Sequence, residues 1–211
     1  MSNAQLAMVD WRRRTSQLYA RVRAEADPAA GHAIWRAERD QMFRTHSQSP
    51  LPPDDEIRTT GITYWPYDRR MRFELPLAPV QHEQLLEMPI SSKQAVTLRL
   101  LGHVPLPAPL AFDLPVWRLQ QYGGGLFVPL RDGTAGTSTY SGGRYLLDTV
   151  KGADLGGSDV AIIIDLNFLY HPSSLYNPSW VSPLAPPSNT TAVRVHAGEM
   201  LAVTPQSLAD G

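Results

Sequence analysis

Apolar side chains recur with two different periods along this chain, and the change falls near residue 55. The first helix is predicted around residues 11–22, where apolar positions repeat at spacings of four, three and four and arginines occupy the other faces. The predicted buried face consists of Trp11, Thr15, Leu18 and Val22. These positions indicate an amphipathic helix that packs on a larger body.

A second helix is predicted to begin at Asp27-Pro28, because Asp is a favourable N-cap and Pro is tolerated in the first turn. The proline-rich residues 49–53 end it, since Pro cannot continue the helical hydrogen bonding. The predicted apolar stripe consists of Trp35, Met42, Phe43 and His46.

From residue 71 onward the apolar period is close to two, which is typical of strands with one buried face. Strands are predicted at 71–77, 96–100, 116–121, 126–130, 139–147, 160–168 and 192–196. Glycines 123–125 predict a hairpin turn between two of them. The expected fold is mainly β (α+β), an antiparallel barrel or sandwich with two N-terminal helices. Within one globular unit, a helical segment 1–55 packs on a β body 56–211.

Composition narrows the functional classes. A hydrophobic share of 43% is enough for a buried core, and a net charge of −1 argues against nucleic acid or an anionic membrane as partner. The absence of cysteine excludes disulfides, thiolate metal sites and Cys nucleophiles. No secretory segment or membrane span is recognisable, so a cytoplasmic location is expected. The sequence identifies no cofactor and predicts no metal site.

Arginines and tyrosines gather around glycines in residues 131–146. If two strands meet across this loop, Arg131 and Arg144 would clamp a small anionic group, and Tyr140 and Tyr145 would donate hydrogen bonds to it. The alternative is structural: the same arginines would form ion pairs with Asp132, Asp148 or Asp165. The spacing alone favours that structural alternative.

Asp165, Asn167, Tyr170 and His171 follow an apolar strand. A buried Asp165 needs a partner, and Arg144 is the expected one. Asp165, Asn167 and His171 would also suit a divalent metal, although capping of the strand end is the favoured interpretation. The candidate ligand-binding residues are therefore Arg131, Asp132, Tyr140, Arg144, Tyr145, Asp165, Asn167 and Tyr170, with His46, Ser49 and His171 as secondary candidates.

Two other functions stay open beside the leading hypothesis, which is a small anionic-ligand binding protein with a polar pocket at strand ends. One is a hydrolase in which His46 serves as base for Ser49, although a His near a helix end is more often structural. The other is an interaction module, with the arginine-rich helices forming a homodimer or partner surface. Whether the protein is an enzyme is left open.

Several segments together resemble a prokaryotic family catalogued as domain of unknown function sixteen eighty-four. The resemblance rests on residues 127–146, 165–170, 183–189 and 195–199, and extends to 34–51 and 64–73. It implies no activity and no catalytic residues. Family members often carry cysteines at the positions of Ser174 and Ser182, so any thiol chemistry in those relatives is not possible here.

Overall fold

The computed structural model describes residues 4–91, 94–120 and 122–202. Two long helices come first, α1 (Ala4–Ala24) and α2 (Pro28–Thr45). Asp27 caps α2 as predicted, since its carboxylate accepts a hydrogen bond from the Ala29 amide. The predicted stripe of α2 is buried, and the predicted face of α1 is buried or half-buried. Both helices are therefore confirmed.

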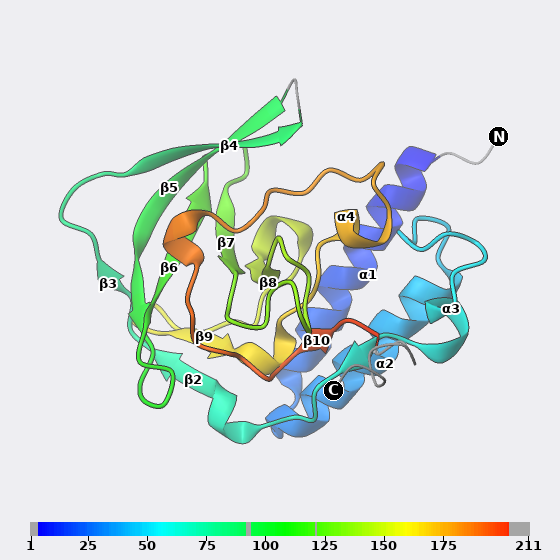
Figure 1. Ribbon diagram of the computed structural model, residues 1–211, viewed down its shortest axis with the longest axis horizontal. Helices are drawn as coiled ribbons and strands as arrows, with labels where there is room; N and C mark the ends of the chain where they lie inside the picture. Colours follow the sequence, from blue (N-terminus) through cyan, green and yellow to red (C-terminus); the bar gives the residue numbers. More distant parts are fainter. Residues whose placement is uncertain (1–3, 92–93, 121, 203–211) are drawn as a thin grey trace.

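A six-stranded antiparallel sheet forms the other side of the molecule, with strand order β3-β5-β6-β7-β8 and β4 paired to β5. Its strands are β3 (Ala78–Pro79), β4 (Leu85–Ser91), β5 (Gln94–Pro105), β6 (Asp113–Leu119), β7 (Gly125–Leu130) and β8 (Arg144–Asp148). Figure 1 shows this sheet, in green, opposite the blue helices α1 and α2.

Two further sheets have two strands each. β2 (Arg72–Leu75) pairs with β9 (Ile162–Asp165), and β1 (Thr63–Tyr64) pairs with β10 (Glu199–Met200). Short helical turns complete the elements: α3 (Ile57–Thr60), η1 (Arg69–Met71), η2 (Thr149–Lys151), η3 (Leu166–Phe168), α4 (Ser173–Tyr176) and η4 (Pro187–Asn189). The mixed α+β fold with antiparallel sheets is confirmed, but the described strands do not close into a barrel.

The main core lies between the helices and one face of the large sheet. It joins Leu18 and Trp35 from the helices to Leu114, Val128 and Leu146 from the sheet. A smaller apolar cluster, which includes Leu98, Trp117 and Phe127, covers the opposite face. Among the described residues, no helix combines the length and apolar character needed to cross a membrane.

The segment after α4 runs across the molecule to the sheet and returns to the helices (Figure 1). At the sheet, the Asn189 amide nitrogen donates to the carbonyls of Pro115 and Pro129, and its oxygen accepts from the Trp117 indole at 2.7 Å. The segment then returns to pair with β1 as β10. This long connection brings Glu199 beside residues of α2.

Candidate functional site

Arg144 begins β8 and lies entirely inside the protein, with 0% of its side chain exposed. Its Nη2 donates to Asp132 Oδ2 at 2.8 Å, and its two terminal nitrogens also donate to the carbonyls of Val195, Ala197 and Glu199. Burial alone would raise the pKa of Asp132, but the Arg144 charge and the Thr134 hydrogen bonds outweigh it and hold that pKa below its usual value. This is the structural ion pair that the sequence left as the alternative.

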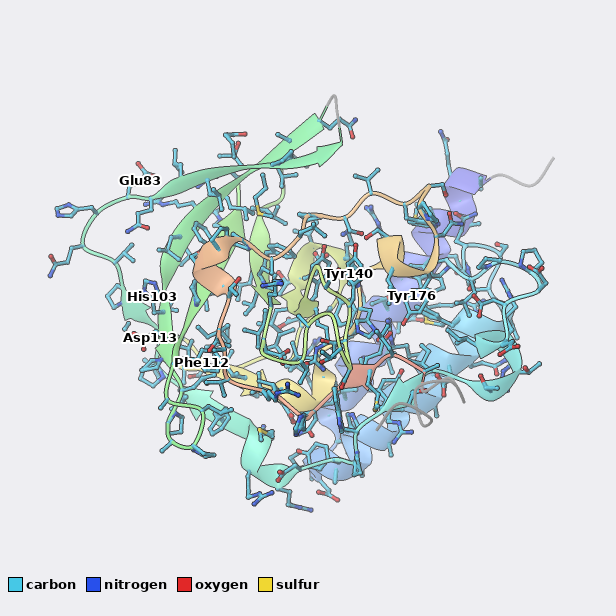
Figure 2. All side chains as sticks on the ribbon, in the orientation of Figure 1. Glu83, His103, Phe112, Asp113, Tyr140 and Tyr176 are labelled. Carbon is cyan, nitrogen blue, oxygen red and sulfur yellow. The ribbon has the colours of Figure 1, made fainter. Side chains whose placement is uncertain are left out.

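Arg131 is exposed, and its Nε donates to the Ser141 carbonyl. The two guanidinium groups therefore do not converge on an accessible hollow, because one is at the surface and the other is enclosed in the interior. Tyr140 is half-buried, and its backbone amide donates to His171 Nε2. Figure 2 shows Tyr140 and Tyr176 in the same part of the molecule, and the Tyr176 ring contacts the imidazole of His171.

Asp165 does not orient Arg144. Its carboxylate accepts hydrogen bonds from the amide and side chain of Asn167 and from the Tyr67 hydroxyl, and it lies 3.9 Å from the Nε of Arg72. Asn167 in turn holds both backbone polar groups of Asp68. The pair caps the end of β9, as the structural alternative expected. Among the described residues, no group of three or more His, Cys, Asp or Glu side chains is placed to hold a metal ion.

Burial raises the pKa of Asp165 to about 6, and the hydrogen bonds from Asn167 and Tyr67 only partly offset that effect. A carboxyl group whose pKa is higher in the folded state than in the unfolded state binds more protons when folded. The contribution of Asp165 to stability should therefore fall as the pH rises from about 4 to about 6, and it should stay low above that range.

Asp165→Asn is expected to raise the free energy of unfolding by about 1–3 kcal/mol near pH 8, and by much less near pH 4. The amide resembles the protonated carboxyl group, so the buried charge is removed while one oxygen still accepts from Asn167. Urea denaturation at the two pH values measures the difference. Asp113→Asn, at an exposed position (Figure 2), is the control and should change little. Equal gains at both pH values would contradict the explanation.

The Ser/His pair of the hydrolase hypothesis is not formed. The Ser49 hydroxyl donates to the Phe43 carbonyl at 2.6 Å and accepts from the Leu51 amide. The imidazole of His46 lies 3.2 Å from Asp10 through Nε2 and accepts the Gln48 amide through Nδ1. Both residues fasten the end of α2.

The helix–sheet cavity lies between α1, α2, the end of β8 and the segment after η3. Its volume is about 90 Å³, enough for a small molecule. Its walls include Tyr19, Arg39, Phe43, Tyr145, Asp148 and Tyr170. The predicted candidates Tyr145, Tyr170 and His171 line this cavity, whereas Arg131, Asp132, Tyr140, Arg144, Asp165 and Asn167 do not. Asp165 lines another cavity beside Arg72.

Arg39 is the charged group of α2 that faces this cavity. It lies four residues after Trp35 and four before Phe43, so it belongs to the buried face of the helix. Its guanidinium carbon lies 4.4 Å from the centre of the Phe43 ring and 4.9 Å from that of Tyr170. Nη2 donates to Glu199 at 2.9 Å, while the buried Nε meets no acceptor among the described residues. The sequence indicates a buried role for Arg39, because a charged residue stands there on the apolar face of a predicted helix.

Glu199 contacts both Arg39 and His171 and helps to hold the Arg39 side chain in place. Glu199 is 0% exposed; burial would raise its pKa, but the charge of Arg39 and the neighbouring His171 imidazole hold that pKa below its usual value. His171 Nδ1 lies 3.2 Å from Glu199 Oε1, and its Nε2 accepts the Tyr140 amide. The proton of the imidazole therefore lies on Nδ1. Nε2 is therefore engaged by the Tyr140 amide, and Nδ1 faces Glu199.

Comparison with known proteins places the chain in a family. The family model described as "Protein of unknown function (DUF1684)" matches residues 58–200, so the resemblance expected for residues 34–51 falls outside the match. The solution NMR structure of the uncharacterised protein from gene locus rrnAC0354 of Haloarcula marismortui is similar, with 29% identity and a TM-score of 0.55 over 79% of this chain and 90% of that one. A search of curated proteins finds no match. The chain belongs to the DUF1684 family of proteins of unknown function.

Proposed function

We propose that this protein binds a small organic anion in the helix–sheet cavity, with Arg39 as the anion-binding group. The observation that carries the proposal is the guanidinium of Arg39, which lines the cavity and keeps its Nε–H without an acceptor among the described residues. A buried donor that lacks an acceptor costs free energy, and a ligand oxygen would remove that cost.

The surroundings of Arg39 favour an anion with an apolar part. Glu199 accepts from Nη2 of the guanidinium, and the Nε–H keeps no acceptor among the described residues. Lys151 also lines the cavity, and its side chain is 49% exposed, so it adds positive charge where solvent can enter. The rings of Trp11, Tyr19 and Phe43 supply apolar walls.

His171 and Tyr145 are not placed to act as general bases in this cavity. A general base needs a nitrogen or oxygen that is free to take a proton from the bound molecule. In the cavity wall, Nε2 of His171 already accepts the Tyr140 amide, and Nδ1 lies 3.2 Å from Glu199 Oε1. The Tyr145 hydroxyl is likewise engaged, since it donates to the Pro183 carbonyl.

Calorimetric titration of the full chain with acetate, butanoate, benzoate, phosphate and sulfate tests the proposal. At least one organic anion should bind, and Arg39→Lys should weaken its affinity about 10- to 100-fold. Lysine keeps the charge opposite Glu199 but lacks the planar fork and the Nε–H. Arg44→Lys, at an exposed position of the same helix, is the matched control and should bind as the wild type does.

The proposal fails if no small organic anion, with or without a further charged group, binds to the wild-type protein. It also fails if Arg39→Lys binds with unchanged affinity, because the anion would then lie elsewhere. Far-ultraviolet circular dichroism of each variant establishes that the fold is kept.

A further inference from the structure

We infer that the ligand of the helix–sheet cavity is a small amino acid-like zwitterion, whose carboxylate contacts Arg39 and whose ammonium group contacts Asp148. The inference rests on the proposed function, because it adds a second contact to the same site. It names the chemical class of the ligand: a carboxylate and a protonated amine on one short carbon skeleton.

Asp148 is the last residue of β8 and is fixed in place at the cavity wall. Its backbone amide and carbonyl are both paired with Ala153, at 3.0 Å each. Its side chain is only 3% exposed, and Oδ2 lies 2.9 Å from the ammonium of Lys151. The other oxygen, Oδ1, is buried and accepts no hydrogen bond from any described residue. A carboxylate oxygen thus lies buried beside the cavity with its acceptor capacity unused.

The buried Oδ1 of Asp148 would be stabilised by a hydrogen-bond donor. Buried polar atoms in folded proteins are nearly always hydrogen-bonded, and a charged acceptor is the most costly kind to leave unpaired. Arg39 presents the complementary case in the same wall, since its Nε–H lacks an acceptor. Two residues of opposite charge therefore line one cavity, and each has a buried polar atom without a hydrogen-bond partner among the described residues. A ligand with both an anion and an ammonium group would satisfy both.

Tyr19 and Tyr170 line the same cavity as Arg39 and Asp148. Burial raises the pKa of each phenol, Asp148 adds to that rise, and Arg39 opposes it. Both rings line the cavity together with Trp11 and Phe43. Aromatic faces attract ammonium groups, so these walls suit the amino end of the ligand as well as its carbon chain. A cavity volume of about 90 Å³ suits a small ligand.

A dicarboxylate held between Arg39 and Lys151 is the competing ligand. Its second carboxylate would lie beside Asp148, whose oxygen would repel it at short range. It would also leave Oδ1 of Asp148 without a donor. The zwitterion avoids both costs.

The test compares matched pairs of ligands by calorimetric titration of the full chain. Glycine, 3-aminopropanoate, 4-aminobutanoate and 6-aminohexanoate are each measured beside the carboxylate that lacks the amino group, with butylamine and succinate as further probes. In the wild-type protein, at least one amino acid should bind about tenfold or more tightly than its parent carboxylate. Asp148→Asn should reduce that ratio to about one. Asp154→Asn, at a nearby position whose side chain is 43% exposed, should keep it.

The possible failures are distinguishable. If carboxylates bind through Arg39 and the amino group adds no affinity at any chain length, the inference is overturned and the proposed function stands. Tightest binding of succinate overturns it in favour of a dicarboxylate. If no carboxylate and no amino acid binds, the proposed function fails as well. The wild-type ratio decides the question even if Asp148→Asn does not fold.

Discussion

Arg144→Met is expected to lower the free energy of unfolding by about 3–5 kcal/mol, because it leaves Asp132 as a buried charge without its partner. The substitution also removes the donor for the carbonyls of Val195, Ala197 and Glu199. Equilibrium denaturation in urea measures the loss, and Arg144→Lys should lose less because it keeps the charge opposite Asp132.

Arg131→Met is the matched control for this prediction. Arg131 carries the same charge thirteen positions earlier, but its side chain is exposed and donates only to the Ser141 carbonyl. Its loss should be within about 0.5 kcal/mol. If Arg144→Met were as stable as Arg131→Met, the buried ion pair would not hold the loop and the C-terminal segment together.

The helices could be predicted from the sequence because local signals and burial agree there. Asp27-Pro28 marks the start of α2, and the stripe from Trp35 to His46 is buried as a unit. The strands β5, β6 and β7 follow from apolar alternation and from the glycine turn between the last two. Where the apolar period matches the element, the chain can be interpreted without its tertiary partners.

The strand predicted at 192–196 is wrong for an instructive reason. Val193 is half-buried and Val195 is buried, with exposed residues between and beside them, as in a strand. The carbonyls of Val195 and Ala197, however, accept from the guanidinium of Arg144 and not from a neighbouring strand. The apolar pattern predicts which side chains are buried, but it does not predict which donor forms hydrogen bonds with the backbone carbonyls. Conversely, β4 was not predicted, because the apolar Leu85 lies on the exposed face with Glu87 and Pro89, so polar and apolar residues do not alternate there.

The candidate site was predicted only in part, since it depends on contacts between distant segments. Tyr145, Tyr170 and His171 line the cavity, but the charges beside them come from α2 and from the end of β8. Asp148 lies 109 positions after Arg39 in the sequence, and no local spacing relates the two. Arg39 itself could have been found, because a charged residue at four-residue spacing from Trp35 and Phe43 must be buried with a partner.

Glu199→Gln should destabilise the protein by about 3 kcal/mol at neutral pH, since the buried guanidinium of Arg39 would lose its carboxylate. The pKa of Glu199 is lowered in the folded state from an ordinary value of 4.5, so its charge stabilises the protein at neutral pH and that contribution is lost as the pH falls below about 4.5. Glutamine cannot titrate, so the difference between variant and wild type should shrink in that acid range. Denaturation curves at neutral pH and near pH 3 measure both effects.

Glu83→Gln is the control. It removes a carboxylate with a 57% exposed side chain (Figure 2) and should cost at most about 1 kcal/mol. A constant difference across the pH range would show that Glu199 acts through its shape alone, and the charge balance around Arg39 would then need another source.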